Sequence, residues 1–96
     1  MAIRSFADKA IEDFYYTGKS AHKAGWANVS DVVKRKLDLL NAAANLNDLK
    51  MPPNNKLEAL KGNLAGFHSI RVNDQWRVVF EWTELGPAKV RVIDYH

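Results

Sequence analysis

Apolar residues in the first half of the chain recur every three or four positions, which is the period of an amphipathic helix. This spacing predicts one helix over residues 8–16, with Asp8 as N-cap and Gly18 as C-cap. A second helix is expected to begin with Ser30 as its N-cap. The segment 51–55 should end it, because proline disfavours helical geometry in the residue before it.

The last third of the chain changes to an alternating period, which is typical of strands. A short alternating run also stands at the start, over residues 3–6. The fold class expected from this order is α+β, with two N-terminal helices packed on one side of a small curved antiparallel sheet, β-α-α-β-β-β. The three predicted C-terminal strands cover residues 68–73, 76–82 and 88–95.

Three sets of residues between and within these elements are assigned to structure. The segment 17–28 lacks periodicity and is expected to be an exposed loop, with Trp26 as the residue able to anchor it. Trp76 and Trp82 fall on the apolar face of their strand and are expected in the core. The run Lys34–Lys36 is expected to be a solvated helix flank.

Composition limits the classes of protein that the chain can represent. Its 96 residues, 47% hydrophobic and 26% charged, predict a single globular domain over residues 1–96. Such a domain is too small for a deep enclosed active site. No apolar run reaches the roughly 20 residues of a membrane span. The absence of cysteine excludes disulfides and thiolate chemistry and is compatible with the reducing cytoplasm.

The charge balance and the strand pattern together indicate where a binding site would form. A net charge of +3 favours an acidic partner such as nucleic acid, but cations and anions are mixed along the whole chain. Alternation places four cations on the sheet face opposite the helices, with Tyr95 at the end of that row. Single-stranded RNA would suit such a face; the alternative is a solvated face with ion pairs to Glu81. The four cations are Arg71, Arg77, Lys89 and Arg91.

Motifs for metal, phosphate-loop, nucleophile-elbow or cofactor chemistry are absent from the sequence, so no metal and no cofactor is expected. His22, His68 and His96 are too far apart for a zinc-ligand spacing. The remaining titratable constellation is the terminal Asp94-Tyr95-His96, whose imidazole can exchange a proton near neutral pH. A frayed chain end is the alternative interpretation of that tripeptide.

Four segments resemble the HigB toxins, a family of the RelE/ParE superfamily of type II toxin–antitoxin systems. The resemblance runs over essentially the whole chain and in the same order. The segment Ser69–Arg77 and the terminal Asp94–His96 are its most specific parts. The four segments are Ile3–Phe6, Leu57–Gly62, Ser69–Arg77 and Asp94–His96.

The resemblance implies a bacterial cytoplasmic toxin that a HigA-type helix-turn-helix antitoxin neutralises. Such a toxin would contact operator DNA only through its antitoxin and would not bind a membrane. Free of the antitoxin, toxins of this family enter the ribosomal A site, contact ribosomal RNA and cleave messenger RNA without a metal. Ribosome-dependent endoribonuclease activity is therefore the function that the resemblance implies.

The resemblance also assigns roles to individual residues. Arg77 matches the arginine that stabilises the scissile phosphate, and Lys61 matches a lysine near it. The catalytic set implied by the family positions is Glu58, Lys61, Arg77, Asp94, Tyr95 and His96. The expected RNA-binding set is Lys56, Arg71, Gln75, Lys89 and Arg91.

Glu58 departs from the family pattern, because many relatives have a histidine there. A glutamate can act as a general base, but it repels phosphate where an imidazolium would attract it. Slower or more selective cleavage is therefore expected. Two other functions stay open: gyrase inhibition without catalysis, as in ParE-type relatives, and a weakly active toxin that serves mainly as co-repressor with its antitoxin.

Overall fold

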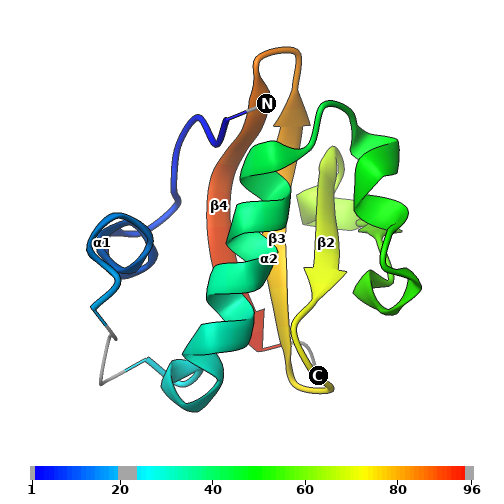
Figure 1. Cartoon of the computed structure of the whole chain (residues 1–96). Helices are drawn as coiled ribbons and strands as arrows, with labels where there is room; N and C mark the ends of the chain where they lie inside the picture. Colours follow the sequence, from blue (N-terminus) through cyan, green and yellow to red (C-terminus); the bar gives the residue numbers. More distant parts are fainter. Residues whose placement is uncertain (1, 20–23, 95–96) are drawn as a thin grey trace.

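The computed structural model describes residues 2–19 and 24–94. Two helices precede a four-stranded antiparallel sheet whose spatial order is β1-β2-β3-β4. Helix α2 lies across one face of the sheet and α1 lies beside β4 (Figure 1). The elements are α1 (Lys9–Thr17), α2 (Ser30–Ala42), β1 (Glu58–Ala59), β2 (Phe67–Arg71), β3 (Trp76–Thr83) and β4 (Gly86–Asp94). Short 3-10 helices are η1 (Ala27–Val29), η2 (Leu46–Lys50), η3 (Pro53–Asn55) and η4 (Gly62–Leu64).

Helix α1 begins and ends as its sequence predicts. The Asp8 side chain accepts a hydrogen bond from the Ile11 N–H at 2.9 Å, which satisfies a free amide of the first turn. Gly18 closes the helix in the left-handed region, at φ 71°, and its N–H donates to the Phe14 carbonyl. Both predicted caps are confirmed.

The predicted ends of α2 are wrong at both termini. Ser30 is the first helical residue and not the N-cap, which is Val29 at the end of η1. The helix stops at Ala42, well before the prolines. It stops there because Asn45 begins η2 with a capping box, in which its side chain and that of Asp48 each accept a backbone N–H of the other residue.

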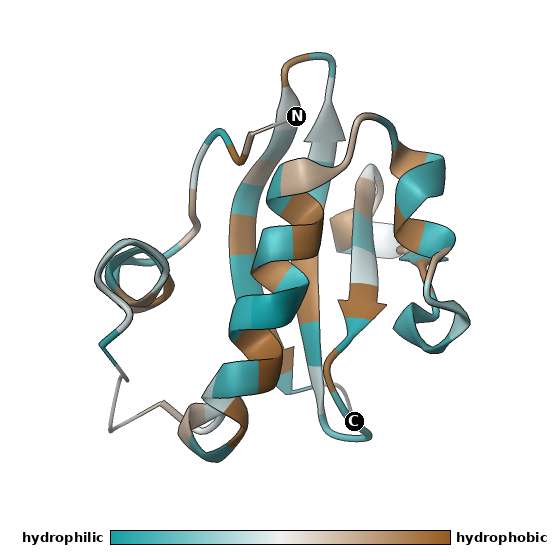
Figure 2. Cartoon of the chain, in the orientation of Figure 1, coloured by the Kyte–Doolittle hydropathy of each residue, from teal (hydrophilic) through white to brown (hydrophobic). Residues whose placement is uncertain are grey.

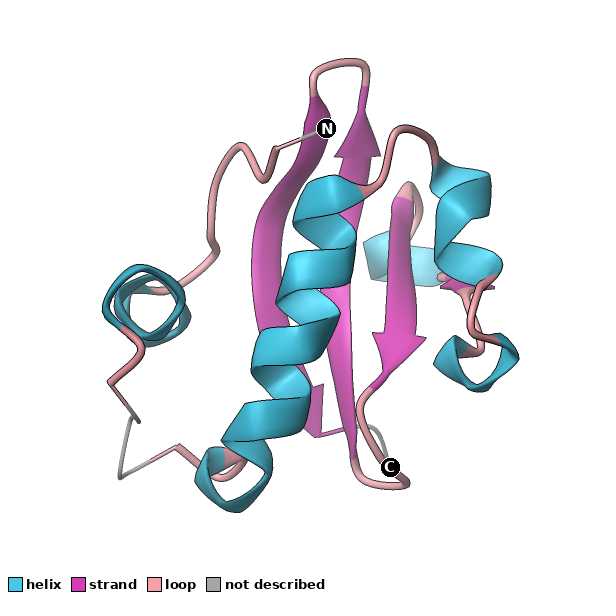
Figure 3. Cartoon of the chain, in the orientation of Figure 1, coloured by secondary structure: helices cyan, strands magenta, loops and turns pink. Residues whose placement is uncertain are grey.

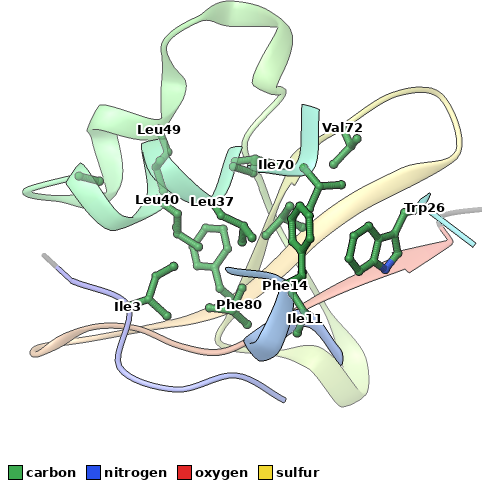
Figure 4. Close-up of a cluster of buried hydrophobic side chains, with 14 residues drawn as sticks. Ile3, Ile11, Phe14, Trp26, Leu37, Leu40, Leu49, Ile70, Val72 and Phe80 are labelled. Carbon is green, nitrogen blue, oxygen red and sulfur yellow. The ribbon is translucent and has the colours of Figure 1, made fainter. Parts of the chain in front are cut away.

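The core lies between α2 and the sheet. Figure 2 shows hydrophobic residues of α2 turned toward the sheet and hydrophilic residues on its outer side. Helix residues Val33, Leu37 and Leu40 are fully buried, as is Phe80 of β3. Figure 4 shows Leu37 and Phe80 close to Ile11 and Phe14 of α1, within one cluster of buried side chains. Burying apolar surface of this kind is the main favourable term in folding.

The tryptophans are structural, as expected. Trp26 is 6% exposed and packs edge-on against Phe14, with ring centroids 5.1 Å apart, so it anchors the end of the segment that joins the two helices. Trp76 and Trp82 pack against the core. A Cβ at Gly25 would lie 2.6 Å from the Trp76 indole, so only glycine allows this close approach.

The predicted strand over residues 3–6 does not form. The segment runs along β4, where the Ala7 N–H donates to the Val90 carbonyl at 2.8 Å, yet it contributes a single parallel bridge between Phe6 and Val90. A bulge in β4 explains the interruption, because the N–H of Lys89 donates to the Ser5 side chain instead of to a ladder carbonyl. The fourth strand is β1, at the opposite edge of the sheet.

The three C-terminal strands form with shifted ends. Strand β2 ends at Arg71, earlier than expected, because the Asn73 side chain accepts the N–H groups of Gln75 and Trp76 and so makes a tight turn. In the part of the chain that the structure describes, no helix is long and apolar enough to cross a membrane.

Candidate functional site

The sheet face turned away from α2 carries the predicted cations, and it is called the polar face below. Cross-strand partners point to the same side of a sheet. Ser69, Val79 and Arg91 stand opposite one another, and Arg71, Arg77 and Ile93 form the next row. The polar face consists of Phe67, Ser69, Arg71, Arg77, Val79, Glu81, Arg91 and Ile93, and the bulge in β4 places Lys89 beside Glu81 at its edge.

The middle of the polar face is covered. The segment 56–66 folds behind the sheet, where η4 lies on the side away from α2 (Figure 3). Ser69 and Val79 are fully buried and Arg77 is 7% exposed. The expectation of a solvated face is therefore wrong at its centre, and the accessible sites are grooves at the edges of the covering segment.

Arg77 is held in place by the protein itself. Its Nε donates to the Ser69 hydroxyl at 2.8 Å, and its Nη2 donates to the Ser69 carbonyl at 3.3 Å. Nη2 also donates to the Lys56 carbonyl of the covering segment. These bonds fix the plane of the guanidinium, so no reorganisation of the arginine is needed when a charge develops beside it.

The carbonyl that holds Arg77 belongs to a turn anchored from α2. Lys56 adopts a left-handed backbone conformation, at φ 47°. Its neighbour Asn55 is fully buried and donates to the carbonyls of Leu49 and Met51 at 3.2 and 3.1 Å. The Asn55 side-chain oxygen accepts from Lys36. The turn is thus tied to two other elements at once.

The prediction that Lys36 lies on a solvated flank of its helix is wrong. Its exposed fraction is 9%, and its ammonium is directed at Asn55. Burial lowers the pKa of Lys36, and the nearby charges of Arg35 and Arg71 lower it further. Local sequence patterns could not predict this contact, because Asn55 lies 19 residues away along the chain.

The end of the polar face next to the β2–β3 turn is rich in positive charge. Arg71 stands directly opposite Arg77, and Arg71 Nη2 contacts Asp74 Oδ1 at 2.6 Å. The hydrogen bond and the charge of Arg71 lower the pKa of the Asp74 carboxyl, and Lys56 contributes to the same effect. Two like charges in one cross-strand pair are unfavourable unless an anion lies near them.

Gln75 and Asp94 are two predicted site residues that the structure joins. Gln75 Nε2 donates to Asp94 Oδ2 at 3.0 Å. Asp94 pairs with Trp76 at the end of β4, one position beyond the row that contains Arg77 and Ile93. Gln75 therefore orients the carboxylate. The predicted site residues Tyr95 and His96 lie outside the described residues.

Glu58 and Lys61 line a groove at one edge of the covering segment. The groove has a volume of about 430 Å3, and Ile93 forms its wall on β4. Both charged side chains are exposed. Asp94 follows Ile93 in β4, and its pairing with Trp76 places its side chain on the other side of the sheet. The lining residues are Glu58, Ala59, Leu60, Lys61, Leu64 and Ile93.

Lys89 and Arg91 line a second groove, of about 510 Å3, at the other edge. Lys89 is exposed and lies 3.9 Å from Glu81, and the bulge gives it a left-handed backbone at φ 53°. Two aromatic residues missed by sequence reasoning complete the groove. Phe67 extends the alternation of β2 one residue further, which was the available signal. The lining residues are Phe6, Ala7, Asn63, Leu64, Phe67, Lys89 and Arg91.

His68 of β2 is a further titratable residue of the sheet. Its ring stacks on Phe80 with centroids 6.2 Å apart, and its Nδ1 is buried without a hydrogen-bond partner in the described part of the chain. Burial lowers the pKa of His68. Across residues 2–19 and 24–94, no cluster of three or more potential ligands could hold a metal ion.

Chemically, the polar face offers a fixed guanidinium, further cations and exposed carboxylates beside shallow grooves. This combination can bind a phosphodiester and stabilise negative charge that develops on it. The grooves are too open to exclude water as a deep enzyme pocket does.

Comparisons with known proteins agree with this architecture. The chain is similar in fold to the structure described as "YoeB-YefM complex from Staphylococcus aureus", with a TM-score of 0.61 and 24% sequence identity. The match covers 100% of this chain and 97% of that one. The "YoeB/ParE toxin from Agrobacterium tumefaciens" matches with a TM-score of 0.55 and 20% identity over 100% of both chains. These likenesses confirm the predicted α+β fold.

The sequence comparisons identify the family. The chain is 42% identical to "Toxin HigB-1" of Vibrio cholerae over 91 residues, which cover 95% of this chain and 94% of that protein. An uncharacterized protein of Haemophilus influenzae is 39% identical over 77 residues, or 80% of this chain and 75% of that protein. Residues 4–96 match the family described as "RelE-like toxin of type II toxin-antitoxin system HigB". The chain therefore belongs to the HigB-like family of RelE-type toxins of type II toxin–antitoxin systems.

Proposed function

We propose that this toxin is a metal-independent, ribosome-dependent endoribonuclease that cleaves messenger RNA in the ribosomal A site and so inhibits translation. The observation that carries the proposal is the fixed guanidinium of Arg77, held by Ser69 and by the Lys56 carbonyl. A donor fixed in advance is what stabilisation of a phosphoryl transition state requires. Membership of the HigB-like family supports the same activity.

The reaction is an attack of a messenger 2′-OH on its adjacent phosphorus. A new 2′-O–P bond forms, the bond from phosphorus to the 5′-oxygen breaks, and the products are a 2′,3′-cyclic phosphate and a 5′-OH end. One group of the toxin takes the 2′ proton and another gives a proton to the leaving oxygen. Arg77 and Lys61 stabilise the charge on the phosphoryl oxygens.

The proton-transfer groups come from the groove beside β1 and from the chain end. Glu58 is exposed on β1 and is the candidate base, and His96 is the candidate partner in proton transfer. Asp94, oriented by Gln75, helps to position the terminal residues, and Tyr95 stacks on a base or orients its neighbour. Lys56 and Arg71 bind phosphates beside the reacting one.

The ribosome supplies geometry that the toxin does not provide. An in-line attack conformation is rarely sampled by free RNA, and correct positioning of reacting groups is worth a large part of a reaction barrier. The grooves of this protein are shallow, and a decoding site that already holds the codon compensates for that. Contacts between cations of the toxin and ribosomal RNA phosphates would make binding fall steeply with salt.

A HigA-type helix-turn-helix antitoxin is the proposed partner, and operator DNA is contacted only through it. The similarity to structures of the YoeB-YefM complex supports an antitoxin partner, since one of them is described as a heterotetrameric toxin-antitoxin complex. The proposed location is the bacterial cytoplasm, where ribosomes and messenger RNA are found.

The test uses programmed ribosomes that carry end-labelled messenger, incubated with wild type and with the variants Arg77→Lys and Lys9→Gln. Cuts confined to the A-site codon, absent from naked RNA and strongly reduced by Arg77→Lys, would support the proposal. Lys9→Gln, on an exposed face of α1, is the matched control and should cut like wild type.

Two other results would redirect the assignment. Absence of cleavage together with inhibition of DNA supercoiling would identify a gyrase inhibitor of the ParE type. Absence of both activities, together with operator binding in complex with the antitoxin, would identify a co-repressor. Thermal unfolding of each variant confirms that a lost activity is not a lost fold.

A further inference from the structure

Phe67 is an aromatic side chain on the side of the sheet that α2 does not cover. It stands opposite Glu81, a polar-face residue, and it is half-buried without belonging to the hydrophobic core or to the residues packed against it. Its ring lines the groove beside β4. An aromatic residue that is not needed for the core and lies beside cations is the usual platform on which a nucleic-acid base stacks.

The charges of this groove favour an anionic ligand. Lys89 and Arg91 line it, and among the residues that the structure describes no acidic one does. Glu81 is the nearby anion, and its 3.9 Å contact with Lys89 is long for a hydrogen-bonded ion pair. Arg91 stands directly opposite Val79 on the polar face, two residues from Ile93.

The backbone conformation that places Lys89 in this groove is energetically unfavourable. Left-handed geometry is unfavourable for a residue with a Cβ, and glycine or asparagine would adopt it more easily. The bond from the Lys89 N–H to the Ser5 hydroxyl, at 2.9 Å, stabilises the bulge. Bulges of this kind commonly re-aim a side chain next to a functional site.

The groove and the proposed catalytic site adjoin the same residue of the covering segment. Leu64 of η4 lines both this groove and the one that holds Glu58 and Lys61. The groove lined by Lys89 and Arg91 has a volume of about 510 Å3, which falls within the range of about 300–1,000 Å3 that small-molecule sites occupy. Asn63, exposed in the same lining, offers an amide donor and acceptor to the edge of a base.

From these observations we propose that the groove formed by Phe6, Asn63, Leu64, Phe67, Lys89 and Arg91 is a second RNA subsite. A single-stranded nucleotide outside the cleaved bond stacks its base on Phe67, and its phosphate contacts Lys89 and Arg91. The inference rests on the proposed RNA substrate. The nucleotide belongs to the bound messenger or to ribosomal RNA, which present the same chemistry.

Binding is measured first, with programmed ribosomes whose messenger carries 2′-O-methyl groups and therefore cannot be cleaved. Phe67→Leu should raise the Kd about tenfold, because base–aromatic stacking contributes that much per base or more. Phe67→Tyr should restore wild-type binding. Leu85→Ala changes an apolar residue that is 70% exposed in the β3–β4 turn, outside the groove, and should leave the Kd unchanged.

The cations are tested through the salt dependence of the same Kd. Lys89→Asn suits the left-handed backbone and removes the charge together with most of the aliphatic side chain, and Arg91→Gln removes the second charge. Each should lower the slope of log Kd against log salt by about one phosphate contact. An unchanged slope in both variants, with Phe67→Leu binding like wild type, overturns the proposal.

The source of the nucleotide is identified by replacing Phe67 with the photo-crosslinker p-benzoylphenylalanine. A crosslink to messenger or to ribosomal RNA supports the subsite and names its ligand. A crosslink to ribosomal protein alone, or none, overturns it. Cleavage assays with the same toxin preparations on unmodified messenger separate the two proposals: crosslinks without cleavage contradict the nuclease, and cleavage without crosslinks contradicts the subsite.

Discussion

The cations at the two ends of the polar face differ in how firmly protein atoms hold them. At the β2–β3 end, Arg77 is 7% exposed, and protein atoms accept hydrogen bonds from its Nε and Nη2. At the β4 end, Lys89 is exposed and has a long contact with one carboxylate. The first cation is fixed by the fold, and the second can move toward a ligand.

This difference corresponds to two separate tasks. Stabilising charge in a transition state requires donors that are in place before the reaction, because moving them would cost free energy at the critical moment. Holding a flexible strand of RNA tolerates mobile cations, because screened attraction to phosphates depends weakly on exact geometry. The comparison therefore predicts that variants at Arg77 change the rate of cleavage and variants at Lys89 change affinity.

The largest expected effect is that of Arg77→Lys. Lysine keeps the charge but lacks the planar fork that bonds Ser69 and the Lys56 carbonyl together. We expect cleavage on programmed ribosomes to fall about 100-fold or more at saturating ribosome concentration. A fall in affinity with an unchanged maximal rate would contradict the division between the two ends.

The turn that holds Arg77 should be nearly as sensitive. Asn55→Ala removes a fully buried amide and leaves the Leu49 carbonyl and the Lys36 ammonium without that partner. The free energy of unfolding, measured in urea, should fall by about 2–3 kcal/mol. Asn54→Ala, at an exposed neighbouring position, is the matched control and should unfold like wild type.

Glu58→His changes the groove toward the pattern of the resembling family. An imidazolium attracts phosphate where the carboxylate repels it, so we expect ribosome-dependent cleavage to rise about tenfold. The rate should be followed from pH 6 to 8, because histidine titrates in that interval. A lower rate in the Glu58→His variant would show that the glutamate itself serves as an indispensable base.

A smaller effect is expected from pH through His68. The pKa of this half-buried ring is lowered in the folded state, so the unfolded chain binds more protons below about pH 6.5. The contribution is therefore fully present above pH 6.5 and is lost as pH falls toward the lower folded pKa. Urea midpoints of wild type and His68→Phe should diverge between pH 7 and pH 5. Parallel curves would exclude His68 as the cause.

The smallest effect is expected on the surface of α1. Lys9 and Asp13 form an ion pair at 3.2 Å, and both side chains are mostly exposed. Solvent screens such pairs, so Lys9→Ala should leave the urea midpoint and the cleavage rate unchanged. A measurable change in cleavage would place α1 in the contact with RNA or ribosome and would break the assignment of binding to the polar face.

Periodicity was enough to predict the elements whose residues bury one face. The caps Asp8 and Gly18 and the apolar set Val33, Leu37 and Leu40 are local patterns, and the structure confirms them. The strand over residues 3–6 was wrong because its pairing depends on a bulge at Lys89, more than 80 positions later in the sequence. Local patterns carry no information about such an interruption.

The sequence was enough to predict which residues belong to the site, but not how buried each residue is or which groups it contacts. Alternation put Arg71, Arg77 and Arg91 on one face, and the strand register agrees. The burial of Arg77 depends on the segment 56–66, which has no period of its own. Lys36 stands in a run of three basic residues, where nothing local distinguishes the one cation that turns inward toward Asn55.

The bond between Arg77 and the Lys56 carbonyl has a consequence for when the protein becomes harmful. Ser69, Lys56 and the flanking strand β4 must all be in place before the guanidinium is fixed, and β4 ends at Asp94. Under the proposed function, a growing chain on the ribosome therefore has no working site until β4 has been synthesised and has paired with β3. Toxicity begins only when this sheet has folded, which gives the cell the time needed for that folding in which to supply the antitoxin.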